Sequence, residues 1–189
     1  MSSADPRRHG HRNALSRRAF VAALAATAAV PMASPARAQI QWHKLDIWKP
    51  YRREDLGFEV EMPGEPEIDV EEDEDGKSID AEFLFVGMMF GATHRESKRV
   101  LSLTDVSAHQ RKIAQRAKGR IIRETSFSLD GLPAIEIVSE LEDAFVSILR
   151  AVVIGNRLIT VDVIGGPDIA ADPSALRFLN SFKLLPRVR

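Results

Sequence analysis

The chain has 189 residues, with 26 basic and 27 acidic side chains and no cysteine, which excludes disulfides and thiolate metal sites. Residues 1–38 hold six of the basic residues and one of the acidic ones, so residues 39–189 carry 20 basic and 26 acidic groups, a formal charge of −6. A part of this length can bury one hydrophobic core, and its acidic balance argues against binding nucleic acid or anionic lipid.

Residues 1–38 have the three parts of a signal peptide. A basic stretch is followed by an uncharged, alanine-rich run of eleven residues from Phe20 to Val30 and by small residues at Ala36 and Ala38. Eleven residues span ~16 Å as a helix, about half of a hydrocarbon core, so no permanent membrane span is expected once the leader is removed. We expect cleavage after Ala38.

The route of export is indicated by a twin-arginine motif inside this leader. Its residues are Ser16, Arg17, Arg18 and Phe20. Adjacent arginines before a weakly hydrophobic core are typical of the pathway that exports folded proteins, and a general secretory signal is the alternative. The sequence therefore predicts a periplasmic or extracellular protein that folds before it is exported.

Residues 39–55 form a predicted docking segment ahead of a single domain at 56–189. Trp42, Trp48 and Tyr51 supply large apolar side chains between charged neighbours. Aromatic residues near a terminus hold that segment on the core, and the alternative is that they form a contact surface for a partner.

From residue 58 onward, alternation of apolar and polar residues predicts β-structure. The expected strands in this part are 58–62, 68–70, 78–86 and 88–96. Asp75-Gly76 is expected to form a hairpin tip, and the acidic run from Glu71 to Asp75 would discourage pairing with another sheet edge.

A helix is predicted next, because Ser102 and Asp105 have the spacing of a capping box. Its apolar face is expected to comprise Leu103, Val106, Ile113 and Ala117. The helix should end at Lys118-Gly119, with the glycine just past the last turn.

The rest of the chain predicts paired strands and one more helix. The strands are expected at 120–129 and 132–141, joined by Asp130-Gly131, and at 145–154 and 157–164, joined by Gly155-Asn156. Asp172-Pro173 starts the helix, and a short strand follows at 181–185. This order predicts an α+β fold, an α/β/α sandwich with a central antiparallel sheet covered by helices.

Four motifs, taken together, resemble those of bacterial PsbP-like domains. They are Gly57-Phe58-Glu59-Val60-Glu61-Met62-Pro63-Gly64-Glu65-Pro66, Asp130-Gly131-Leu132-Pro133-Ala134, the hairpin from Arg150 to Val163, and Phe178-Leu179-Asn180-Ser181-Phe182-Lys183-Leu184. Ile159 departs from the pattern, which often has an aromatic residue there. The resemblance covers about residues 55–185 and implies an α/β/α sandwich that binds other proteins, with no enzymatic activity common to the family.

Histidines are the main candidates for chemistry. His94 and Glu96 would share one face of a strand, but a zinc site needs three or four ligands, so a solvated face is favoured. His109 borders the apolar face of the predicted helix, which favours a partly buried histidine. No nucleophile motif and no phosphate-binding glycine loop is present.

A partner could bind a sheet edge, the aromatic N-terminal segment or a basic cluster, and the alternative for the basic cluster is a solvated outer helix face. Arg111, Lys112 and Arg116 lie on the first predicted helix, and Lys118, Arg120 and Arg123 follow it. We therefore predict an exported, non-enzymatic domain, without a cofactor, that binds another protein of the cell envelope. One alternative is a carrier of a small apolar ligand beside Met88, Met89 and Phe90. A hydrolase or metal enzyme that uses His94 or His109 is less favoured.

Overall fold

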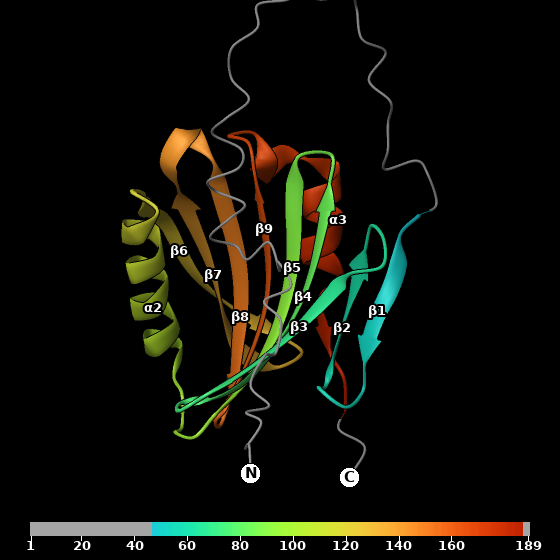
Figure 1. The fold of residues 1–189 in the computed structure, drawn as a ribbon, viewed down its shortest axis with the longest axis vertical. Helices are drawn as coiled ribbons and strands as arrows, with labels where there is room; N and C mark the ends of the chain where they lie inside the picture. The colour runs from blue at the N-terminus through green and yellow to red at the C-terminus, as the bar shows by residue number, and fades with distance from the viewer. Residues whose placement is uncertain (1–46, 187–189) are drawn as a thin grey trace, which may run out of the picture. The chain divides into compact units, whose positions relative to one another are not determined.

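The computed structural model describes residues 47–186 (Figure 1). The strands in this range are β1 (Lys49–Arg53), β2 (Phe58–Met62), β3 (Glu67–Asp73), β4 (Gly76–Phe85), β5 (Met88–Ser97), β6 (Arg120–Leu129), β7 (Leu132–Glu140), β8 (Val146–Ile154), β9 (Arg157–Gly165) and β10 (Lys183–Leu184). The helices are α2 (Leu103–Arg116) and α3 (Pro173–Ser181), and η2 (Glu142–Ala144) and η3 (Ile169–Ala171) are 3-10 turns. The predicted α+β class is confirmed.

Seven strands form one antiparallel sheet in the order β3-β4-β5-β9-β8-β7-β6. The predicted turns at Asp130-Gly131 and Gly155-Asn156 join β6 to β7 and β8 to β9. Asp130 and both glycines have the positive φ angles that tight hairpin turns require. At one edge of the sheet, every residue of β3 is exposed, and its carboxylates leave this edge strongly acidic.

A second, three-stranded sheet was not predicted. Its order is β1-β2-β10, so the strand expected at 58–62 pairs with partners from both ends of the described range. Glu59 on β2 accepts from Lys183 Nζ at 2.7 Å and from Arg52 at 2.8 Å, which ties the three strands together. Because those partners lie far away in the sequence, the alternation within 58–62 could not distinguish the two sheets.

Helix α2 packs on one face of the large sheet, where Val106 joins Ile135, Ile137, Leu149 and Ala151 in a buried cluster. The predicted capping box is present, with the Ser102 hydroxyl accepting from the Asp105 amide and the Asp105 carboxylate accepting from the Ser102 amide. The predicted apolar face is partly wrong.

Two features of this helix differ from the prediction. Ile113 is 38% exposed, and Ala114 is buried in its place. At the end of the helix, the positive φ angle belongs to Lys118 rather than Gly119. Gly119 instead lies against the backbone of Glu140, where a Cβ atom would overlap the Glu140 carbonyl oxygen.

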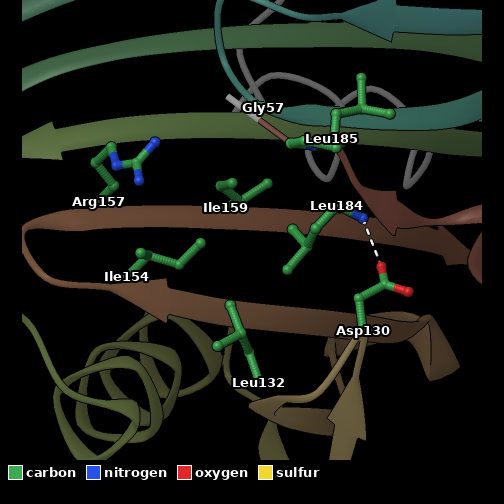
Figure 2. Close-up of a pocket in the computed structure, with 9 residues that line it drawn as sticks. Gly57, Asp130, Leu132, Ile154, Arg157, Ile159, Leu184 and Leu185 are labelled. Atoms are coloured by element: carbon green, nitrogen blue, oxygen red, sulfur yellow. Dashed lines mark hydrogen bonds between the residues drawn. The ribbon is translucent and has the colours of Figure 1, made fainter. Parts of the chain in front are cut away.

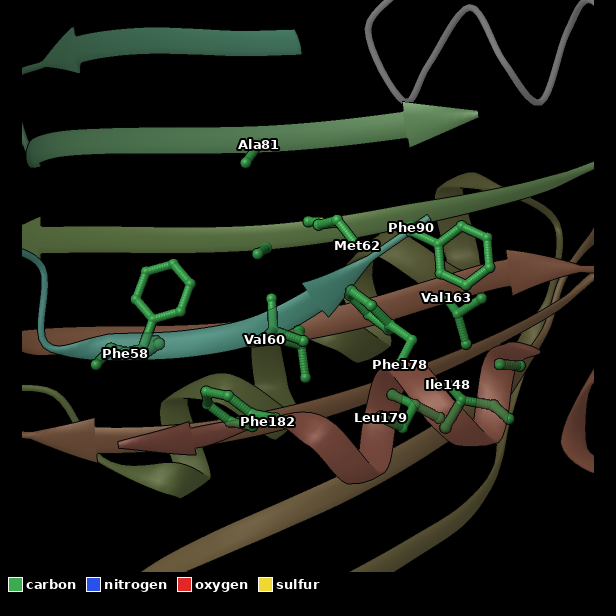
Figure 3. Close-up of a cluster of buried hydrophobic side chains, with 14 of the residues drawn as sticks. Phe58, Val60, Met62, Ala81, Phe90, Ile148, Val163, Phe178, Leu179 and Phe182 are labelled. Carbon is green, nitrogen blue, oxygen red and sulfur yellow. The ribbon is translucent and has the colours of Figure 1, made fainter. Parts of the chain in front are cut away.

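The opposite face of the sheet carries the main core, which it shares with α3 and the small sheet (Figure 3). Phe58, Val60 and Met62 of β2 contribute alternate side chains to this core, and Phe178 and Leu179 of α3 pack into it. The Asp172 carboxylate caps α3 by accepting from the amides of Ser174 and Ala175, as predicted. The predicted α/β/α sandwich is therefore confirmed in part. Helix α2 covers one face of the large sheet, but the layer on the other face contains the small sheet as well as α3.

Candidate ligand pocket and partner surface

A pocket of about 310 Å³ lies where four segments of the domain meet (Figure 2). Gly57 comes from the loop before β2, and Asp130 and Leu132 come from the β6–β7 hairpin. The remaining lining residues are Ile154, Arg157 and Ile159 from β8 and β9, and Leu184, Leu185 and Pro186 from the C-terminal segment. This volume is at the small end of the range for small-molecule sites.

Two hydrogen bonds hold the wall formed by the C-terminal segment. The Leu184 amide donates to Asp130 Oδ2 at 2.7 Å, and the Leu185 amide donates to the Gly57 carbonyl at 2.9 Å. The Asp130 carboxylate therefore has a structural task, which is to fasten β10 to the β6–β7 turn.

The lining is mainly aliphatic, with one cation and one anion. Figure 2 shows Arg157 at one end of the lining and Asp130 at the other, with Ile154, Ile159 and Leu184 between them. Such a lining suits a ligand with an apolar body and a single polar group.

This pocket is not where the sequence placed a ligand. Phe90 is fully buried and packs edge-on against Phe178, with 5.2 Å between the ring centroids, and Met89 is also buried. In the pairing of β5 with β9, Met89 is opposite Ile164, whereas Arg157 pairs with Glu96 at the other end of the strands. The pocket described above therefore does not include Met88, Met89 or Phe90, and the expected ligand position beside them stays a prediction.

The four motifs quoted above meet around this pocket. Gly57, Asp130, Arg157 and Leu184 each belong to a different one of them, and all four residues line the cavity. Sequence reasoning treated these motifs as turns and strand ends and missed that they enclose a common space. The charged residues among them, Asp130 and Arg157, were the available signal.

The basic residues of α2 divide into two kinds. Arg111 pairs with Glu124 at 3.2 Å, and its charge is largely balanced. Lys112 and Arg116 are exposed and form no hydrogen bond or ion pair with other residues of the range 47–186. Ile113 is exposed between them in the sequence, so α2 presents an apolar side chain flanked by two cations.

The rest of the predicted basic cluster is neutralised by neighbouring carboxylates. Lys118 pairs with Glu142 at 2.6 Å, Arg120 with Glu140 at 3.0 Å, and Arg123 with Glu136 at 2.9 Å. The predicted partner surface is thereby narrowed to the α2 patch, which we define as Lys112, Ile113 and Arg116.

The sheet order separates this patch from the acidic part of the domain. Residues 65–75 contain eight carboxylates, and most of them lie on β3 or its turn. β3 is one edge strand of the large sheet, and α2 packs on β6, β7 and β8 toward the other edge. The acidic turn after β3 reaches the start of α2, where the Lys98 amide donates to the Asp75 carbonyl at 2.8 Å, whereas the α2 patch lies toward the end of the helix. This distribution orients an approaching charged partner.

The two candidate histidines lie in different environments. His94 is buried on the sheet face that carries the main core, opposite Ile159 in the β5–β9 pairing, so the expected solvated position is wrong. His109 retains exposed surface on α2 while its ring is partly covered, so the predicted partly buried position is met in part. The pKa of His109 is lowered because its ring is partly withdrawn from water and because Arg95, Arg116 and Lys112 are nearby cations. Within residues 47–186, no three His, Asp or Glu side chains gather as a metal site would require.

The aromatic residues of the docking segment have different environments. Trp48 is 5% exposed and packs edge-on against Phe90, with the Arg177 guanidinium 4.9 Å from its ring centroid. Its proposed use as a partner surface is therefore wrong, since the ring belongs to the core. Tyr51 is half-buried on β1. Trp42 and the leader residues 1–38 lie outside the described range.

None of the helices within 47–186 is long and apolar enough to cross a bilayer.

The arrangement of these elements defines a small α+β domain with an antiparallel sheet, one helix on each face and a pocket at one end. No protein-family profile and no curated protein matches the sequence. The solved structure of cyanobacterial PsbP from Synechocystis superposes with a TM-score of 0.56 at 18% identity, over 82% of this chain and 99% of that one.

The domain thus has the PsbP-like fold, as the sequence motifs predicted. A protein of unknown function from Pseudomonas aeruginosa is also similar, with a TM-score of 0.44 at 12% identity, over 75% of this chain and 99% of that one.

Proposed function

We propose that this chain is an exported, non-enzymatic domain that binds an acidic partner protein in the cell envelope through the α2 patch. The observation that carries the proposal is that Lys112 and Arg116 flank an exposed Ile113 without an ion-pair partner in the described domain. Interfaces are enriched in arginine around a buried apolar centre, and the lysine adds positive charge that complements an acidic partner.

The charge distribution supports the same proposal. A domain with a formal charge of −6 repels an acidic partner over most of its surface, so attraction is confined to the basic side. The acidic β3 strand packs on β4, whereas α2 packs on β6, β7 and β8, and this separation strengthens the orientation. Complementary charge of this kind raises the association rate and selects the face that docks.

The test is capture of partners on immobilised mature protein, residues 39–189, from an envelope extract of the native cells. We expect the wild type to retain a protein that the double variant Lys112→Glu and Arg116→Glu retains about tenfold less, because like charges then face each other across the contact. Raising the salt concentration should weaken the capture by the wild type.

The matched control is the double variant Lys77→Glu and Lys98→Glu, which changes the net charge equally at two exposed positions away from α2. It should capture the partner as the wild type does. Equal capture by both double variants, or no protein specifically retained by the wild type, would refute the proposal.

Export is tested separately through the leader. We expect the double variant Arg17→Lys and Arg18→Lys to accumulate in the cytoplasm with the leader attached, because the arginine pair is the signal that the folded-protein pathway reads. Cell fractionation with mass spectrometry of the N-terminus measures this, and the exported wild type should begin at Gln39. The pair Arg7→Lys and Arg8→Lys serves as the control. Unchanged export of the first double variant would point to the general secretory route.

A further inference from the structure

We propose that the pocket between the β6–β7 hairpin, the β8–β9 hairpin and the C-terminal segment is a binding site for a small monocarboxylate with an aliphatic body. This site is independent of the α2 patch. Its lining combines five aliphatic side chains with a single cation, Arg157, and it is formed by segments from four parts of the chain.

The aliphatic walls of the pocket indicate that the ligand has an apolar body. Leu132, Ile154, Ile159, Leu184 and Leu185 present aliphatic side chains to the cavity. Burying aliphatic surface there contributes about 25 cal/mol per Å² removed from water. A volume of about 310 Å³ is sufficient for a short chain or a small ring.

The guanidinium of Arg157 indicates that the polar group of the ligand is a carboxylate. A guanidinium has five N–H donors in a planar fork that matches the two oxygens of a carboxylate, so it can engage one while keeping other contacts. Arg157 lies directly after the Gly155-Asn156 turn, whose geometry fixes the first residue of β9. The cation is therefore placed by a rigid hairpin at one end of the pocket.

A second carboxylate on the ligand is disfavoured by Asp130. This residue lies at the other end of the lining, and one of its oxygens is engaged by the Leu184 amide. Like charge at that end would repel the distal group of a dicarboxylate. The two charged residues together therefore select a ligand with one anionic end.

Ile159 lies beneath the pocket, where a larger side chain could occupy the space. Its side chain is fully buried and lines the pocket from the middle of the sheet face. A larger aromatic side chain at this position would extend into the adjacent space and fill it. Ile159→Phe is thus a way to remove the site while retaining an apolar core residue.

The experiment is isothermal titration of the mature protein with octanoate as the probe, and with octanol, octylamine and suberate for comparison. We expect one octanoate per chain and weaker binding of suberate, octanol and octylamine. Arg157→Gln should weaken octanoate binding about tenfold or more, the loss expected for a charged hydrogen-bonded contact, and leave octanol binding unchanged.

Two further measurements locate the site. Ile159→Phe should abolish binding of both octanoate and octanol, and Arg120→Gln, on the exposed start of β6, should change neither. In the wild type, octanoate should shift the methyl NMR signals of Leu132, Leu184 and Leu185. Absence of octanoate binding, equal binding to Arg157→Gln, or shifts confined to another part of the domain would overturn the proposal.

Discussion

Phe178→Ala is expected to lower the free energy of unfolding by about 3–5 kcal/mol, because it removes a fully buried aromatic ring from the main core. The ring lies between the large sheet and the small one and contacts Phe90 edge-on. The Ser181 hydroxyl of α3 accepts from the Glu61 amide of β2 at 2.8 Å, which limits how far the helix can move to close the space. Urea unfolding followed by tryptophan fluorescence measures the loss.

The control lies two residues away on the same helix. Leu176 is 40% exposed, so Leu176→Ala removes little buried surface and should change the unfolding free energy by about 0.5 kcal/mol. Both variants replace a large apolar residue of the same helix with alanine. Similar losses for the two variants would mean that α3 does not anchor the core as described.

Local features of the fold could be predicted from the sequence because short segments determine them. The Gly155-Asn156 turn, the Ser102–Asp105 capping box and the Asp172 cap all depend on residues within four positions of one another. The small sheet could not be predicted in the same way. Strand β2 pairs with residues 183–184 at the other end of the described range, and nothing within 58–62 indicates which strand is its neighbour.

The second feature that the sequence could not predict was which face of a strand is buried. Alternation places Phe90, Ala92 and His94 on one face of β5, but it does not say whether that face is covered. The cover comes from α3 and the small sheet, and His94 is buried as a result. The same limit applies to Trp48, whose ring could have been a surface or an anchor until its contact with Phe90 placed it in the core.

The two candidate sites differ in how far the sequence anticipated them. Lys112 and Arg116 were recognisable as cations on a helix, but their distinction from Arg111 depends on Glu124, a residue of the adjacent strand. The pocket was not anticipated, because its residues are individually typical of turns and strand ends. Arg157 and Asp130 acquire a shared role only when two hairpins and the C-terminal segment meet.

Gly119→Ala is expected to destabilise the domain by about 1–3 kcal/mol or more, because the new Cβ atom would overlap the backbone of Glu140. A clash with backbone cannot be relieved by a side-chain rotation, so the junction between α2 and β7 must move. The bonds at risk are Gly119 N–H to the Ala114 carbonyl at 2.8 Å and Glu142 N–H to the Ala117 carbonyl at 3.0 Å.

Hydrogen exchange measures this effect locally, because the backbone amides at positions 119 and 142 should exchange faster in the variant than in the wild type. The midpoint of urea unfolding should also be lower. The control is Gly166→Ala, where a Cβ atom would meet no heavy atom within 4 Å. That variant should be neutral or more stable by up to about 1 kcal/mol, since alanine restricts the unfolded chain. Equal stability of the two variants would contradict the close approach, and with it the attachment of α2 that positions Lys112 and Arg116 on the basic side of the sheet.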